Sequence, residues 1–191
     1  NPDDMTASFI ISAKNSYLDK TSLNVYKPIL KGNELPYTYN DIYGKISLNS
    51  TNGSKINFFG FNFTDDVMNY KSISNFGWDS YGGGVNFVVI PGKSPTMIEG
   101  NVAYSDYEAR LEEANNPNRN SSINGFNAGF AFTYFLGKNT LKYGIEMLGF
   151  KTVFDYFKSN GIHISQVDNT TELGAYVKSK AQFDKLILEP S

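Results

Sequence analysis

Along most of the chain, apolar and polar residues alternate one by one. The alternation runs through Asp41–Asn49, and it returns with several aromatic residues in Asn124–Tyr134. In Leu141–Met147 the polar positions include the charged Lys142 and Glu146. Because successive side chains of a β-strand point to opposite faces, this period of two predicts strands that have one apolar and one polar face.

The same pattern predicts nine strands, separated by connections of two kinds. The strands are Thr6–Lys14, Asp41–Asn49, Lys55–Asn69, Trp78–Ile90, Thr96–Tyr107, Asn124–Tyr134, Leu141–Met147, Glu172–Lys180 and Asp184–Glu189. Tight turns are predicted at Ser50–Lys55, Pro91–Pro95, Leu136–Thr140 and Ala181–Asp184. Long polar loops are predicted at Asn15–Pro36, Asp65–Phe76, Glu108–Ser122 and Lys151–Thr170. Short and long connections that alternate are typical of bacterial outer-membrane barrels, which have short periplasmic turns and long extracellular loops.

The polar face of these strands carries charge, so it must meet water. An unpaired Lys142 or Glu146 would be costly in the core of a β-sandwich. Aromatic residues near the predicted strand ends suggest a membrane-interface girdle, made of Tyr37, Tyr39, Trp78, Tyr107, Tyr134 and Phe150. We therefore predict an all-β fold, an antiparallel up-and-down transmembrane β-barrel. A soluble sandwich or propeller is the alternative.

Composition narrows the possible functions further. The 191 residues contain no apolar run of the roughly 18 residues that a membrane helix needs. Lys and Arg number 17 against 19 Asp and Glu, and both signs are dispersed, so no nucleic-acid-binding face is expected. The absence of cysteine and the single His163 exclude a disulfide framework and a cysteine or histidine metal cluster. The chain begins without an export signal, which suggests a mature protein or an excised piece.

Three motifs invite a chemical interpretation, and none is convincing. His163, Ser165 and Asp168 contain the residue types of a hydrolase, but they lie too close together in a predicted loop. Gly82-Gly83-Gly84 lies inside a strand pattern with no following helix, so it is no phosphate loop. A calcium site is conceivable on an acidic loop, but the spacing matches no known cage; its residues are Glu108, Glu112, Glu113, Asn115 and Asn116. We expect no enzyme and no cofactor.

Two further sets of residues are positions at which a ligand could bind. Aromatic residues that could stack on a sugar or another ligand are Tyr26, Tyr37, Tyr70, Tyr156 and Phe157. Polar residues that could line a path through the barrel are Tyr43, Lys45, Glu99, Asn101, Lys142, Glu146, Tyr176 and Lys178. The residues do not identify a ligand.

Several stretches resemble the first barrel strands of Bacteroidota-type TonB-dependent receptors. The first is Ser8–Asp19, followed by Leu35–Tyr37 and Asp41–Ile46. Others follow in the order that the family uses: Gly60-Phe61, Asp65, Trp78, Ala103–Tyr107, Gly144–Glu146, Ala175–Val177 and Leu186–Ser191. The resemblance covers nearly the whole chain. Such receptors commonly carry Arg where Asn15 stands, so a loop contact of that Arg is in doubt here.

The resemblance implies that residues 1–191 are part of one transmembrane β-barrel domain, an incomplete portion of a barrel of about 22 strands. The plug domain and the remaining strands would lie outside this chain. The expected location is the bacterial cell outer membrane, and the expected function is the uptake of a nutrient or other ligand. The implied partners are the TonB complex, through a region absent here, the outer-membrane lipid, and a surface lipoprotein or other outer-membrane subunits.

Two alternatives to uptake remain open. A receptor-derived barrel can act as a structural subunit of an outer-membrane assembly. A small self-contained barrel of about 8 to 10 strands would be an adhesin or an enzyme. In that small barrel the first strand would pair with the last.

Overall fold

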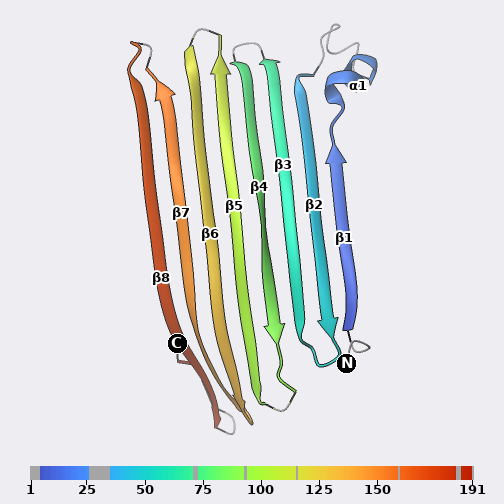
Figure 1. The fold of residues 1–191 in the computed structure, drawn as a ribbon, viewed down its shortest axis with the longest axis vertical. Coiled ribbons are helices and arrows are strands. Elements are labelled where there is room, and N and C mark those ends of the chain that lie inside the picture. The colour runs from blue at the N-terminus through green and yellow to red at the C-terminus, as the bar shows by residue number, and fades with distance from the viewer. Residues whose placement is uncertain are drawn as a thin grey trace.

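The computed structural model describes residues 5–25, 35–70, 73–92, 94–114, 116–158, 160–183 and 186–190. These residues form one antiparallel sheet of nine strands, in which each strand pairs with its neighbours in sequence (Figure 1). The elements are β1 Met5–Asn15, α1 Leu18–Val25, β2 Tyr37–Ser50, β3 Lys55–Tyr70, β4 Ile73–Val89, β5 Thr96–Glu113, β6 Asn116–Leu136, β7 Asn139–Phe157, β8 His163–Phe183 and β9 Leu186–Leu188. The predicted all-β, up-and-down arrangement of nine strands is confirmed.

The described sheet is open. Its order runs from β1 to β9 without a crossover, and among the described residues β1 pairs only with β2. A small closed barrel would need β1 to pair with β8 or β9, and these strands do not make that pairing. The expected separation of the first and last strands is therefore confirmed.

Three segments predicted as long polar loops are mostly strand. The structure carries β3 to Tyr70, β5 to Glu113 and the start of β8 back to His163. The prediction failed because polar side chains here occupy the positions that apolar ones hold elsewhere in the same strands. At the end of β5 the period of two continues with reversed chemistry, whereas the end of β3 and the start of β8 carry polar residues on both faces.

Two other boundaries also differ from the prediction. The predicted loop Asn15–Pro36 contains the helix α1, where the Ser16 hydroxyl accepts a hydrogen bond from the Leu18 backbone N–H at 3.3 Å. Within the last predicted strand, Asp184–Glu189, the structure describes β9 over Leu186–Leu188, and Asp184 and Lys185 lie outside the described part of the chain.

The β2–β3, β4–β5 and β6–β7 connections lie at one end of the sheet, and α1 lies at the other end (Figure 1). Gly53 and Gly137 have φ angles of 88° and 62°, which favour glycine in these tight turns. The β2–β3 turn is tied to the end of β4, because the Asn52 amide donates to the Ile90 carbonyl at 2.9 Å. Adjacent hairpins are thus fixed to one another at this end. At the α1 end the strand bounds leave only two residues between β3 and β4 and two between β5 and β6, so the predicted alternation of short and long connections is wrong there.

Register assigns each side chain to one of two faces, because residues directly opposite in an antiparallel pair point the same way. The face that carries Phe9, Ile46 and Phe58 is called the belt face. The other, which carries Glu99 and Lys142, is called the ion-pair face.

The belt face carries an uninterrupted apolar band across eight strands. In its central rows the side chains are Ala7, Phe9, Ile11, Ile46, Leu48, Ile56, Phe58, Val85, Phe87, Ile98, Val102, Tyr104, Phe126, Ala128, Phe130, Phe132, Tyr143, Ile145, Met147, Leu173, Ala175 and Val177. The other residues in these rows are Met5, Val89, Ser50, Thr171 and five glycines, so the band contains no charged side chain and no amide. In β6 it extends from Phe126 to Tyr134, which is about 27 Å along the strand.

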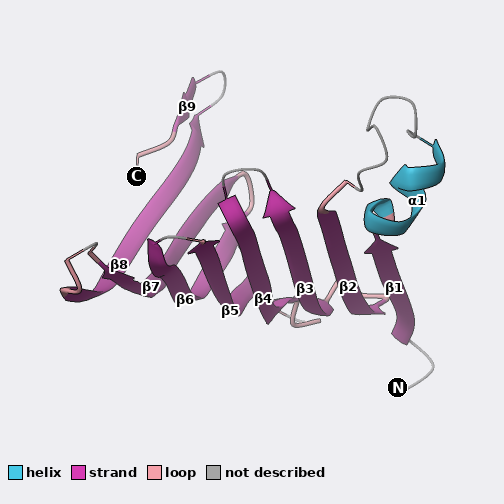
Figure 2. Ribbon diagram, turned by 90° about the horizontal axis from the view of Figure 1, so that it is seen from above, coloured by secondary structure: helices cyan, strands magenta, loops and turns pink. Residues whose placement is uncertain are grey.

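The ion-pair face is the more crowded of the two. The described strand residues with buried side chains are Asn57, Ala131 and Thr133, and register places all three on this face. On the belt face, by contrast, Phe9 and Leu173 remain 75% and 76% exposed. Seen from above, the sheet is bent, with β8 and β9 turned away from the line of the earlier strands (Figure 2). Crowding on one face is what curvature produces, because side chains converge on the concave side.

Aromatic rings lie over glycines on adjacent strands at four directly paired positions. The pairs are Phe61–Gly82, Phe87–Gly100, Phe126–Gly149 and Tyr176–Gly144. A Cβ added at any of these glycines would meet the ring of its partner. The ring fills the space that a side chain would otherwise fill, which helps to fix the strand register.

The pair Phe87–Gly100 gives a test of this packing. We expect Gly100→Ala to lower the free energy of unfolding by about 1 kcal/mol, because the new methyl group must displace the ring. Urea titration would measure it. Gly44→Ala is the matched control, since a Cβ at Gly44 meets nothing within 4 Å. Equal effects of the two substitutions would contradict this role of Phe87.

Candidate ligand-binding face

The lower part of the ion-pair face, toward the short turns, is charged. Lys142 and Glu99 form an ion pair between β7 and β5, and both side chains are about one-third exposed. On β8 the ammonium group of Lys178 lies 5.3 Å from the centre of the Tyr176 ring. In these rows the belt face opposite carries no charge, so all ionic groups at this level lie on one side of the sheet.

Above the charged part runs a row of small polar side chains. The row Ser8–Ser47–Asn57–Asn86–Asn101 crosses five strands in register. The Asn57 amide donates to the Asn86 side-chain oxygen at 2.7 Å, and the Asn101 amide donates to that of Asn127 on β6. Paired amides can be buried at little cost, which explains how Asn57 is only 7% exposed.

Further toward the end of the sheet that carries α1, the side chains of the ion-pair face become aromatic. Its aromatic side chains are Tyr37, Tyr39, Tyr43, Phe59, Phe61, Phe63, Phe76, Trp78, Tyr107, Phe150, Phe154 and Tyr156. Several pack together; the Phe61 and Phe63 rings are stacked at 4.9 Å, and the Trp78 and Tyr107 rings are 5.8 Å apart.

The belt face at this level is polar. Its side chains include Asn62, Asp66, Asp79, Asp106, Glu108, Arg110, Asn120, Asn124, Lys151 and Asp155. The two faces therefore exchange their chemistry along the strands.

An apolar hollow of about 500 Å³ lies within the aromatic part. Phe59 and Phe61 of β3 line one side, and Leu148 and Phe150 of β7 line the other. The floor between them consists of the small residues Ala103, Ser105 and Gly125. Bulky residues on the outer strands and small ones on the middle strands create the depression, and its volume is in the range of small-molecule sites.

Acidic residues lie beside the aromatic part, at Asp41 and Asp65. Partial burial, together with the neighbouring carboxylates of Asp41 and Asp66, raises the pKa of Asp65 above its ordinary value of 3.8. Among the described residues no group of three or more acidic or histidine side chains is arranged to hold a metal ion.

The eight polar residues predicted to line a path all lie on the ion-pair face. They are Tyr43, Lys45, Glu99, Asn101, Lys142, Glu146, Tyr176 and Lys178. Of the predicted aromatic ligand contacts, Tyr37 and Tyr156 lie on this face, and Phe157 lies on the belt face. Tyr26 and the side chain of Tyr70 lie outside the described residues.

The predicted aromatic girdle is wrong for five of its six members. Tyr37, Tyr39, Trp78, Tyr107 and Phe150 lie on the ion-pair face, and only Tyr134 lies on the belt face. The prediction used nearness to strand ends and ignored whether each position was odd or even within its strand. Register instead places Tyr81, Tyr104 and Phe126 at the upper border of the band.

The candidate hydrolase residues do not converge. They belong to β8 and not to a loop, and the strand places His163 and Ser165 on the belt face and Asp168 on the opposite face. His163 contacts Asp155 through Nε2, while Asp168 accepts a hydrogen bond from Gln166 at 2.7 Å.

The acidic residues weighed as a calcium site are also divided. Glu108 and Glu112 lie on the belt face and Glu113 on the other, where Arg119 pairs with it at 3.2 Å. The Asn75 amide donates to Glu112 at 3.0 Å. Asn115 lies outside the described residues. These carboxylates are thus paired within the sheet.

The chain matches no protein-family model, no curated protein and no solved structure. Within the described part of the chain, no helix is both long and apolar enough to cross a membrane.

The raised pKa of Asp65 predicts a pH dependence of stability. A carboxyl group whose pKa is raised by folding destabilises the folded state once it ionises, so this cost disappears as the pH falls toward 3.8. We expect Asp65→Asn to increase the free energy of unfolding slightly at pH 7 and to have no effect near pH 3. Urea titrations at both pH values would measure this.

Asp168→Asn is the control for Asp65→Asn. It removes one negative charge from the same face on β8 without touching Asp41 or Asp66. If Asp65→Asn had a lower free energy of unfolding than the parent protein at pH 7, the proposed cost of ionising Asp65 in the folded state would be contradicted.

Proposed function

We propose that this chain is part of a transmembrane β-barrel in the bacterial outer membrane, and that the whole protein is a TonB-dependent receptor. It would bind a nutrient outside the cell and admit it when the TonB complex acts on a region outside this chain. The observation that carries the membrane proposal is the segregation of charge. In the rows of the apolar band, every charged side chain lies on the ion-pair face.

Lipid explains this segregation better than a second protein layer. The band is continuous across eight strands, and about 27 Å along a strand tilted by about 35–45° spans a height of about 19–22 Å, close to the roughly 25 Å apolar band of outer-membrane barrels. The opposite face then faces a water-filled interior, which accounts for the Glu99–Lys142 ion pair. Beyond the band, the reversed polarity suits strands that rise into water on the outside.

The ligand, in this proposal, contacts the hollow on the ion-pair face. This hollow lies between the polar interior and the end of the sheet that carries α1, where a ligand would enter from outside the cell. Phe61 and Phe150 offer flat apolar surfaces, and Asn127 offers a polar group beside them. Such an arrangement favours a ligand with an apolar or ring-shaped part.

Placing lysine at adjacent positions in β2 tests the membrane proposal. Ile46 lies in the apolar band and is 52% exposed, while Ser47 lies on the ion-pair face. We expect Ile46→Lys to destabilise the full-length protein by about 2–4 kcal/mol in a bilayer, because the charge would face lipid. Ser47→Lys should be tolerated.

Both lysine variants would be followed by their amounts in the outer-membrane fraction and by urea unfolding in vesicles. If Ser47→Lys proved the more damaging, the assignment of the two faces would be reversed. Equal tolerance of both variants would exclude a lipid environment for the band.

Uptake can be tested without knowing the ligand. Small molecules in the growth medium would be compared after growth of the parent, a strain that lacks the full-length protein and a strain that lacks TonB. We expect a compound that only the parent consumes. Phe150→Ala should slow its uptake about tenfold, because a hydrophobic contact is lost, whereas Leu173→Ala on the belt face should not.

If the three strains deplete the medium identically, transport is excluded. Copurification of the protein at fixed stoichiometry with other outer-membrane proteins would then favour the structural subunit. The two lysine variants test the membrane placement independently of uptake. The membrane proposal and the transport proposal can therefore be refuted separately.

A further inference from the structure

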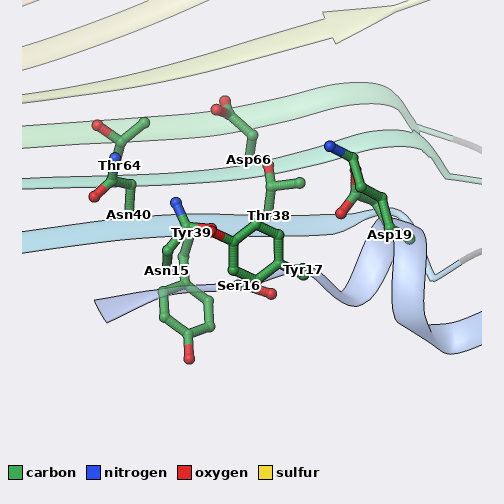
Figure 3. Close-up of a pocket in the computed structure, with 10 residues that line it drawn as sticks. Asn15, Ser16, Tyr17, Asp19, Thr38, Tyr39, Asn40, Thr64 and Asp66 are labelled. Carbon is green, nitrogen blue, oxygen red and sulfur yellow. The ribbon is translucent and has the colours of Figure 1, made fainter. Parts of the chain in front are cut away.

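A second hollow, of about 320 Å³, lies on the belt face between the α1 segment and the ends of β1 to β3 (Figure 3). Register places Asn15, Asn40 and Thr64 in one cross-strand row on that face, with Thr38 and Asp66 in the next. Figure 3 shows these five side chains together with Tyr17 and Asp19 of the segment that carries α1. The hollow thus has a polar floor contributed by three strands.

The segment above this floor is held in place by hydrogen bonds. The Ser16 N–H donates to the Tyr39 carbonyl at 2.8 Å, and Ser16 itself is only 8% exposed. In α1, Ser22 is fully buried, and its hydroxyl accepts from the Leu35 N–H at 2.9 Å. Tyr17 nevertheless remains 60% exposed, so its ring is available beside the polar floor.

Among the described residues, three of the polar side chains of this floor lack the kind of partner that similar groups on neighbouring strands possess, while the Thr64 hydroxyl donates to the Asn62 side-chain oxygen at 3.5 Å. On β4 and β5, Asp79 pairs with Arg110. Within the described residues, the side chains of Asn15, Thr38 and Asn40 make no hydrogen bond to protein. Amide and hydroxyl groups supply both donors and acceptors, so together they can satisfy the hydroxyl groups of a sugar.

Charge and size restrict the ligand further. The charged groups that line the hollow are Asp19, Asp66 and Lys20, which sum to one negative charge at neutral pH. A phosphate group would meet more repulsion than attraction there. The volume equals that of roughly ten water molecules at about 30 Å³ each, and it lies at the low end for ligand sites. A neutral sugar of one or two rings meets these conditions.

The hollow also lies next to the apolar band. Asn40 precedes Ile42 by two residues in β2, so the two lie about 7 Å apart along the strand, with Asn40 nearer α1. Ile42 still carries an apolar side chain on the belt face and is 50% exposed. A molecule whose polar end fills the hollow can therefore lay an apolar chain along the band.

We propose that this hollow binds the neutral sugar headgroup of an outer-membrane glycolipid, whose acyl chains lie against the apolar band. The inference rests on the membrane placement proposed above, and it is independent of transport. Asn40 and Thr64 donate and accept hydrogen bonds with the sugar hydroxyls, and the Tyr17 ring covers one face of the sugar. The bound lipid is held on the outside of the sheet, away from the hollow on the ion-pair face.

Dodecyl maltoside is a suitable probe, because it joins a neutral disaccharide to a single alkyl chain. The full-length protein would be purified in dodecyl-dimethylamine oxide, which contains no sugar, and titrated with the probe under native mass spectrometry. We expect one adduct that the double variant Asn40→Leu/Thr64→Val binds about tenfold more weakly. Ser122→Val is the matched control, because Ser122 lies in the same cross-strand row and face but on β6.

Three headgroup comparisons complete the test. Octaethylene glycol dodecyl ether, with the same chain and no sugar, should not form the adduct, nor should dodecyl phosphate. Free maltose should compete only weakly. Equal binding by the double variant, or a preference for either sugar-free detergent, would overturn the site. Full competition by free maltose would overturn the lipid assignment.

This experiment can be read independently of the proposed function. An adduct that depends on Asn40 and Thr64 in a protein that tolerates Ile46→Lys would refute the membrane placement but retain the sugar site. A membrane-embedded protein with no such adduct would refute only the site.

Discussion

The structure depends on the unbroken pairing of long antiparallel strands. With a side-chain period of two, a slip of one residue would move every side chain of a strand to the other face. Such a slip in β7 would place Lys142 and Glu146 in the apolar band. Pairing runs without interruption through the band, and the one irregularity lies beyond it, between Leu111 and Glu113. Register is thus tied directly to the separation of charge from the apolar surface.

Side-chain shape reinforces this register. A ring that lies over a glycine of the adjacent strand fits only when the two residues are directly opposite, as Phe126 and Gly149 are. The amide pair of Asn57 and Asn86 adds a polar equivalent on the other face. Both kinds of contact are specific in position, whereas apolar contact along the band is not. The apolar band favours an arrangement in which the apolar segments of all strands lie side by side. The ring–glycine and amide pairs then fix which residues are directly opposite one another.

The reversal of polarity along the strands gives each face two environments. On the belt face, apolar residues give way to Asp66, Asp79 and Arg110, and the polar hollow below α1 forms near that border. On the ion-pair face, charged groups give way to aromatic residues, and the apolar hollow forms there. The two candidate sites therefore lie on opposite sides of one sheet, at levels where the chemistry changes. A ligand in one does not obstruct the other.

The sequence by itself determined the strand count, the up-and-down order of the strands and the face of Lys142, Glu146 and their six companions. These follow from alternation, which is a local property of each strand. Only the tertiary structure decided how far the strands extend, because Asp65–Tyr70 and His163–Thr170 carry polar residues on both faces, and a search for alternating apolar positions misses them. It also decided that Phe126 lies over Gly149, and that Asn15, Asn40 and Thr64 line one hollow. Those facts depend on which residues of different strands are opposite one another, and pairing between strands is not encoded in the spacing within any one of them.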